Sequence, residues 1–282
     1  MPGQKIKIVA PLLLTPEFYF LPRSFSIVTS SRNAIRLGML SERPWKLDAI
    51  VRLLLGIAIC ICFVQFAAAL IQHFHDQGKL PQASPLFTLI ANLGLHASIL
   101  VAITVFLRLE HIRWRDAFGF ATPGLGFAIL LGLVVGIAFI PLGMSLQWLS
   151  LKAMGLFSLP TPEQQAVQIL KSAGPGLDRI SLIIFTVFIA PPAEEMFFRG
   201  ILYPTIKQYG YPRLALWGTA LLFALIHFNP PIFVPLTVLA LALTFLYEKT
   251  NNLLACIVAH AAFNAANVVL LYVNDPGFHP PH

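Results

Sequence analysis

The chain has 282 residues, of which 57% are hydrophobic and only 11% are charged, with a mean hydropathy of +0.77. A soluble domain carries roughly 25% charged residues, so this composition predicts an all-α, polytopic membrane protein whose first partners are membrane lipids. The formal net charge is +7, but Lys and Arg are scattered singly, without the basic, aromatic-rich run of a nucleic-acid site, so nucleic acid is excluded as a partner.

Residues 1–46 form a basic arm, which we expect to be a cytoplasmic or interfacial extension. Its apolar patch "IVAPLLL" is too short to span a bilayer and is interrupted by Pro11, with Pro16 close behind. No small-residue cleavage site follows the patch, which argues against a cleavable signal peptide. Met39 is an alternative start of translation.

Apolar runs long enough to cross a bilayer are predicted on both sides of a polar segment, residues 153–178. The N-terminal transmembrane region, 47–152, contains the runs 48–72, 86–107 and 124–151. The second region, 179–273, contains 179–209, 213–228, 231–247 and 253–273, and a short tail of residues 274–282 follows. We therefore expect one bundle of about seven spans, within a range of six to eight.

The polar segment 153–178 contains a short amphipathic helix that starts near Thr161, Pro162 and Glu163. We expect this segment to lie at the membrane interface or to cover an opening. Lys and Arg in the loops are more frequent on the side of the N-terminal arm, which favours a cytoplasmic N-terminus. The predicted location is the plasma (inner) membrane, with several passes through it.

The stretch "FIAPPAEEMFFRG" places charged residues inside an apolar run. Because proline is common in the first turn of a helix, a new helix is predicted to begin near Pro191 or Pro192, with Glu194 and Glu195 in its first turn beside a wet pocket. Glu195 and Arg199 have the i,i+4 spacing of a helical ion pair, whereas Glu194 points about 100° away and is the freer carboxylate. An alternative is that all three residues only brace neighbouring helices.

His227, His260 and Asn264 are predicted to approach Glu194 from two further helices. The turn at 209–212 makes 193–209 and 213–228 an antiparallel pair, and Glu194 and His227 both lie roughly 20–25 Å from that turn at 1.5 Å per residue. His260 and Asn264 share one face of the last helix and reach a similar depth. Phe223 lies one turn before His227 on the same face. A polar active site inside the membrane follows from this convergence.

Glu194, His227 and His260 could also bind zinc or another divalent metal with one coordination position left for water. The HExxH motif and its inverse are absent from the sequence. The sequence therefore leaves open whether the protein uses a metal cofactor. The other histidines are interpreted as packing or solvated groups: His96, His279 and His282, and a loop cluster of His73, His75 and Asp76.

Three motifs on apolar helices, E-E-x-x-x-R at 194–199, F-x-x-x-H at 223–227 and H-x-x-x-N at 260–264, together resemble one known family. It is the CAAX-protease and bacteriocin-processing family of intramembrane proteases, also called the type II CAAX prenyl endopeptidase or Abi family. The resemblance covers roughly residues 178–273. It implies that Glu194 activates water, that His227 assists it, and that His260 and Asn264 line a metal or oxyanion position. Glu195 and Arg199 are then architectural.

The resulting hypothesis is an intramembrane endopeptidase that hydrolyses membrane-associated or lipid-modified peptide substrates, with or without a metal. One alternative is a non-catalytic immunity or peptide-binding membrane protein of the same fold. Another is a proton-coupled carrier. The sequence has no internal repeat, which counts against the carrier.

Overall fold

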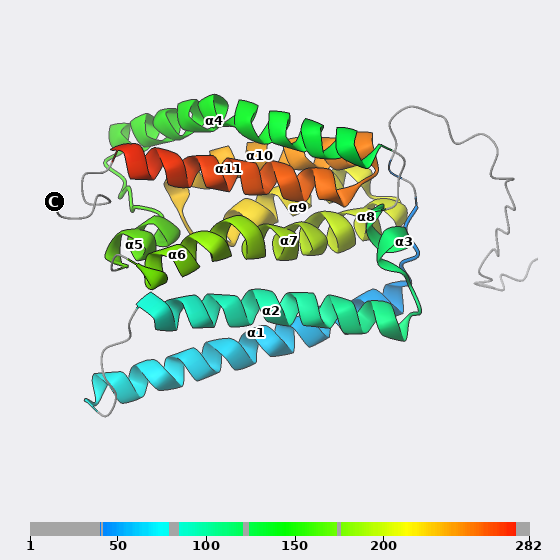
Figure 1. Ribbon diagram of the computed structural model, residues 1–282, viewed down its shortest axis with the longest axis horizontal. Helices are drawn as coiled ribbons and strands as arrows, with labels where there is room; N and C mark the ends of the chain where they lie inside the picture. The colour runs from blue at the N-terminus through cyan, green and yellow to red at the C-terminus, as the bar shows by residue number, and fades with distance from the viewer. Residues whose placement is uncertain (1–39, 41, 79–84, 121–123, 174–175, 275–282) are drawn as a thin grey trace, which may run out of the picture. The chain divides into compact units, whose positions relative to one another are not determined.

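The computed structural model describes residues 40, 42–78, 85–120, 124–173 and 176–274, and these residues contain helices and no strand (Figure 1). The described residues all belong to one compact unit. The elements in chain order are α1 (Leu47–Asp76), α2 (Pro85–Leu109), α3 (Trp114–Phe118), α4 (Leu125–Leu156), α5 (Gln165–Ser172), α6 (Leu177–Ile184), η1 (Phe185–Ile189), α7 (Ala190–Glu195), η2 (Met196–Leu202), α8 (Tyr203–Gln208), α9 (Pro212–Leu225), α10 (Pro230–Thr250) and α11 (Leu253–Asn274).

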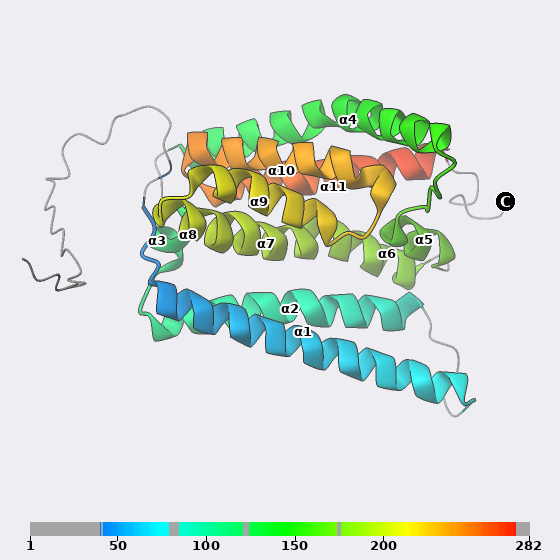
Figure 2. The same cartoon turned by 180° about the vertical axis from the view of Figure 1, so that it is seen from behind.

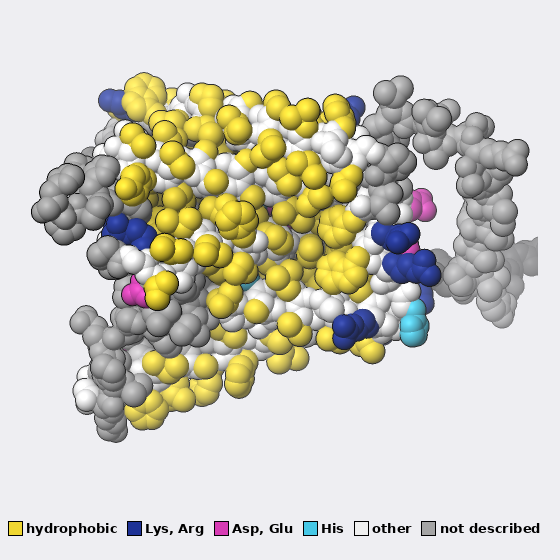
Figure 3. Space-filling view, viewed as in Figure 1, with side chains coloured by type: hydrophobic (Ala, Val, Ile, Leu, Met, Phe, Trp, Pro, Cys, Tyr) yellow, Lys and Arg dark blue, Asp and Glu magenta, His cyan; other side chains and the backbone are white. Residues whose placement is uncertain are grey.

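Five helical segments of the described chain are long and apolar enough to cross a membrane: Leu47–Phe74, Leu125–Leu156, Leu177–Gln208, Pro230–Thr250 and Leu253–Asn274. Two shorter apolar helices, Leu93–Leu109 and Pro212–Leu225, complete a set that agrees with about seven spans. Hydrophobic side chains cover the flank of the bundle, and charged ones gather at its two ends (Figure 3). The predicted all-α transmembrane fold is confirmed, and the chain is a multi-pass membrane protein.

Helices α4, α10 and α11 pack against one another, with α10 the most buried of the three and α4 at the edge of the bundle (Figure 1). Gly132 and Gly136 lie one turn apart on α4 and let its backbone approach α11 closely. A Cβ atom built on Gly132 would be 2.5 Å from the Ala255 carbonyl oxygen, and one on Gly136 would be 2.3 Å from that of Ala259. Small residues at this spacing are typical of membrane helices in close contact, because lipid supplies little hydrophobic force between them.

The α1–α2 hairpin lies along the side of the bundle formed by α6, α7 and α8 (Figure 2). The first half of α1 is packed, with Ile50 and Ile57 buried, whereas large apolar residues in its second half, such as Phe63 and Phe66, are exposed. Toward its end α1 leans away from the other helices (Figures 1 and 2). The exposed half therefore presents a surface suited to lipid.

The helix that carries the two glutamates does not begin at Pro191 or Pro192, so that prediction is wrong. The chain is helical without interruption from Leu177 to Gln208, and it widens into π-helical turns at η1 and η2. In η1 the N–H of Ala190 donates to the carbonyl of Phe185, five residues earlier. A wide turn of this kind is how the helix accommodates two prolines that cannot donate, and such turns are frequent at functional sites.

The amphipathic helix and the N-terminal arm also differ from the sequence predictions. The amphipathic helix α5 begins at Gln165 rather than near Thr161, and its Leu170 packs with Ala173 and Leu182 in a small cluster of buried residues. Part of the N-terminal arm packs into the bundle instead of extending from it, since Arg43 and Trp45 are buried. Residues 1–39 of the arm and the tail 275–282 lie outside the described residues.

Candidate active site

Glu194 lies on α7, near the middle of its span, and contacts two histidines from other helices. Its Oε1 is 3.2 Å from Nε2 of His96 on α2, and its Oε2 is 3.8 Å from Nε2 of His260 on α11. The Glu194 side chain is 17% exposed, so it is largely removed from the surface yet accessible. A carboxylate at this depth is costly unless it has polar partners, and the two imidazoles provide them.

Glu195 and Arg199 form the predicted ion pair, and both side chains are buried. Arg199 Nη1 donates to Glu195 Oε1 at 2.8 Å. The same oxygen is 2.8 Å from His260 Nδ1. A carboxylate oxygen accepts hydrogen bonds, so His260 carries a proton on Nδ1. His260 thus joins the two glutamates and is oriented by the buried pair.

Phe223 on α9 is completely buried and packs beneath the polar residues. The Arg199 guanidinium lies 4.6 Å from the centre of its ring, and the His260 ring packs against it edge to face at 5.8 Å. This contact with the ring face stabilises a buried guanidinium by about 2 kcal/mol when it is desolvated. Phe223 therefore packs against both Arg199 and His260.

His227 follows the end of α9, where its Nδ1 lies 2.7 Å from the Phe223 carbonyl oxygen. A carbonyl can only accept, so Nδ1 carries the proton and neutral His227 presents a lone pair at Nε2. The His227 ring packs on Phe223 at 5.0 Å, and the same Phe223 ring contacts His260 at 5.8 Å. Phe223 thus links His227 to His260, which lies 3.8 Å from Glu194.

Asn264 on α11 donates its amide to the carbonyl of Thr186 in η1 at 3.0 Å. The hydrogen-bond register of η1 assigns this carbonyl to the N–H of residue 191, and Pro191 has none. Asn264 thus satisfies an acceptor that the proline leaves open, a contact that the sequence analysis did not anticipate. Asn267, one turn further, is exposed and bonds to its own helix.

The sequence analysis interpreted His96 as a packing or solvated residue, and that interpretation is wrong. Its Nε2 contacts Glu194 directly. The His96 ring also packs edge to face on Phe185 at 5.0 Å. One signal in the sequence could have identified it: an ionisable residue in the middle of a membrane span is a functional candidate by default. His73, by contrast, is exposed and bonds to Gln77, so within the described chain it lies apart from this cluster.

A metal ion bound by Glu194, His227 and His260 would require their donor atoms to converge on one point. In the described part of the chain, no three His, Cys, Asp or Glu side chains are arranged in this way. The residues as placed do not fit a metal centre, and we derive no step through one.

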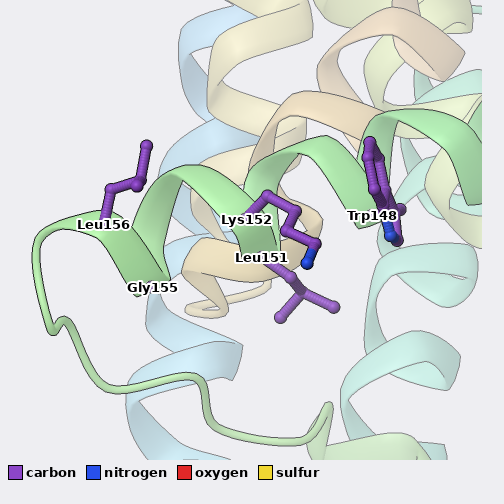
Figure 4. Close-up of a pocket in the computed structure, with 5 residues that line it drawn as sticks. All are labelled: Trp148, Leu151, Lys152, Gly155 and Leu156. Atoms are coloured by element: carbon purple, nitrogen blue, oxygen red, sulfur yellow. The ribbon is translucent and has the colours of Figure 1, made fainter.

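A pocket with a volume of about 470 Å³ lies at the C-terminal end of α4 and is lined by Trp148, Leu151, Lys152, Gly155 and Leu156 (Figure 4). The Lys152 ammonium lies 5.6 Å from the centre of the Trp148 ring. An aromatic residue beside a lysine at a helix end is common where a span reaches the membrane interface. None of the residues around Glu194 lines this pocket.

Comparison with known proteins concerns the second half of the chain. Residues 176–266 match the family described as type II CAAX prenyl endopeptidase Rce1-like. The family resemblance is confirmed. The match contains all three motifs, whereas His96 and Trp45 lie outside it.

One curated relative, the uncharacterized protein YpbD of Bacillus subtilis (strain 168), is 34% identical over 87 residues. The aligned region covers 29% of this chain and 42% of the relative's length. No solved structure gives a significant match. The Rce1-like match spans the helices from α6 to the first two thirds of α11.

Proposed function

We propose that this protein is an intramembrane endopeptidase in which Glu194 activates the water that cleaves a peptide bond. The observation that carries the proposal is the Glu194 carboxylate at mid-span, with His96 Nε2 at 3.2 Å and His260 Nε2 at 3.8 Å. Carboxylates and imidazoles arranged in this way are suited to general acid–base catalysis. The Rce1-like match over residues 176–266 supports the same class of reaction.

In the proposed reaction, Glu194 takes a proton from water as the oxygen attacks the carbonyl carbon of the substrate. The tetrahedral intermediate then collapses, the C–N bond breaks, and the leaving amine receives the proton from Glu194. His227 assists the first step, because its Nδ1–H is held by the Phe223 carbonyl and its Nε2 lone pair can accept a hydrogen bond from the water.

The negative charge on the attacked oxygen requires N–H donors nearby. One amide hydrogen of Asn264 is used by the Thr186 carbonyl. The other is our proposed donor. His260, whose Nδ1–H is used by Glu195 in the buried pair with Arg199, adds a second N–H from Nε2 when its ring is doubly protonated. The substrate class is a membrane-associated or lipid-modified peptide, and the location is the plasma membrane.

The test uses purified protein in detergent and a fluorescence-quenched peptide that carries a farnesylated C-terminal cysteine. We expect Glu194→Gln to abolish cleavage while its unfolding temperature stays close to that of the wild type. Glu163→Gln is the matched control, since Glu163 is an exposed glutamate paired with Lys171 outside the site. Cleavage by Glu194→Gln at the wild-type rate would contradict the mechanism. A wild type that binds the peptide without cutting it would favour the peptide-binding alternative.

A further inference from the structure

Trp45 belongs to a short strap, residues 42–46, that packs against the helix carrying the two glutamates. Its indole Nε1 donates to the Gly200 carbonyl in η2 at 3.2 Å, and the side chain is 7% exposed. The indole ring packs on Phe106 of α2 at 5.6 Å and on Phe118 of α3 at 6.4 Å. A buried indole N–H that reaches a carbonyl of another element is a specific contact, not incidental packing.

The Gly200 carbonyl accepts a hydrogen bond from outside its own helix. An α-helical turn would pair it with the N–H of residue 204, and residue 204 is proline. At this point the helix is widened, since the Tyr203 N–H donates to Phe198, five residues earlier. Pro204 can donate neither to Gly200 nor to Arg199, so a donor from outside the helix stabilises this turn.

The arrangement at η2 resembles the one at η1. In η1 the carbonyl that the five-residue register assigns to Pro191 receives the Asn264 amide, and in η2 the carbonyl that an α-helical register would assign to Pro204 receives the Trp45 indole. The two contacts lie on either side of Glu194 and Glu195. Each π-helical segment is thus fixed by one side chain from a different part of the fold.

Trp45 does not touch Glu194 or His260 but is connected to them through a series of contacts. Gly200 is next to Arg199, whose guanidinium donates to Glu195 at 2.8 Å, and Glu195 is 2.8 Å from His260. His260 in turn contacts Glu194. A shift of the η2 backbone therefore displaces the groups that orient His260.

The strap itself is anchored at several points. Arg43 Nη2 donates to Asn251 Oδ1 at 2.8 Å, and its guanidinium lies 5.2 Å from the centre of the Tyr247 ring. Gln208 Nε2 donates to the Arg43 carbonyl at 2.8 Å. These contacts hold the backbone next to Trp45 at the end of α8 and α10, so the indole is presented from a fixed support.

We propose that Trp45 is a positioning residue: its N–H holds the π-helical turn at Gly200, and this sets the geometry of Arg199, Glu195 and His260 for hydrolysis at Glu194. The predicted change in kcat rests on the proposed function. Trp45→Phe keeps an aromatic ring and removes the N–H. Because a displacement of about 1 Å can cost a hundredfold in rate, we expect a ten- to hundredfold lower kcat with little change in KM.

The decisive variant is Pro204→Ala, which returns a backbone N–H one helical turn after Gly200. In the Trp45→Phe background it is expected to restore most of the lost kcat for the farnesylated peptide. Trp217→Phe, a change at an exposed tryptophan of α9, is the control and leaves kcat unchanged. A purely packing role for Trp45 predicts no rescue, and either that result or full activity of Trp45→Phe overturns the proposal.

Hydrogen exchange of the amides in residues 196–203 gives a readout that does not depend on catalysis. We expect faster exchange in Trp45→Phe and a return toward the wild-type rate with Pro204→Ala. If the wild type fails to cleave the peptide but exchange changes in this way, the proposed function fails and the role of Trp45 stands. Unchanged exchange in Trp45→Phe would overturn the role of Trp45 whatever the activity.

Discussion

Gly136→Ala tests how closely α4 and α11 approach each other. The added Cβ would lie 2.3 Å from the Ala259 carbonyl oxygen, and ordinary contact begins at 3.4 Å, so the two helices must separate by about 1.1 Å. His260 follows Ala259 directly, and its Nδ1 is 2.8 Å from Glu195 Oε1. A shift of that size along this contact takes it beyond hydrogen-bond distance.

Thermal unfolding in detergent, followed by circular dichroism, measures the effect on stability. We expect Gly136→Ala to lower the free energy of unfolding by about 1–3 kcal/mol, the usual cost of overpacking. Gly126→Ala on the same helix is the control, because its Cβ meets nothing within 4 Å and alanine is the better helix former by about 1 kcal/mol. Equal stability of the two variants would refute the close packing of α4 on α11.

Three further variants test the buried contacts. Arg199→Met leaves the Glu195 charge buried beside His260 without its cation, and we expect the free energy of unfolding to fall by about 3–5 kcal/mol. The loss should be smaller in the double variant Arg199→Met/Glu195→Gln, and an equal loss in the single and the double variant would contradict the ion pair. Arg43→Gln is expected to cost about 1–3 kcal/mol by the same unfolding measurement, and no loss would mean that the strap contributes nothing to the fold. His96→Phe is expected to lower peptide cleavage about ten- to hundredfold, corresponding to a charge-assisted hydrogen bond of about 1.5–3 kcal/mol, and unaltered cleavage would separate His96 from the site.

The spans and the helical pairs were predictable because they depend on local sequence. The length of each apolar run determines whether it can cross a bilayer, and the i,i+4 spacing of Glu195 and Arg199 places them on one helical face. The prediction that Glu194 and His227 lie at a common depth came from counting residues on either side of one short turn. In each case the relevant distance is set within a single helix or helical hairpin.

The π-helical turns and the contact with His96 depend on the tertiary fold. A proline pair usually marks the first turn of a helix, and here the helix continues because Asn264, 73 positions beyond Pro191, supplies a hydrogen bond to Thr186. His96 reaches Glu194 only because α2 packs on α7 with the face that carries His96 turned inward. None of the three sequence motifs indicates this contact. Local patterns could not reveal partners that are so distant in the sequence.

The central claim is that Glu194 activates water for peptide hydrolysis inside the membrane. It is tested most directly by comparing new protein termini in the membrane proteome of cells that carry the wild type, Glu194→Gln or Glu163→Gln at equal abundance. The account predicts a set of termini that the wild type and Glu163→Gln produce and that Glu194→Gln lacks, with the uncut precursors accumulating. The same termini in cells that carry Glu194→Gln would contradict it.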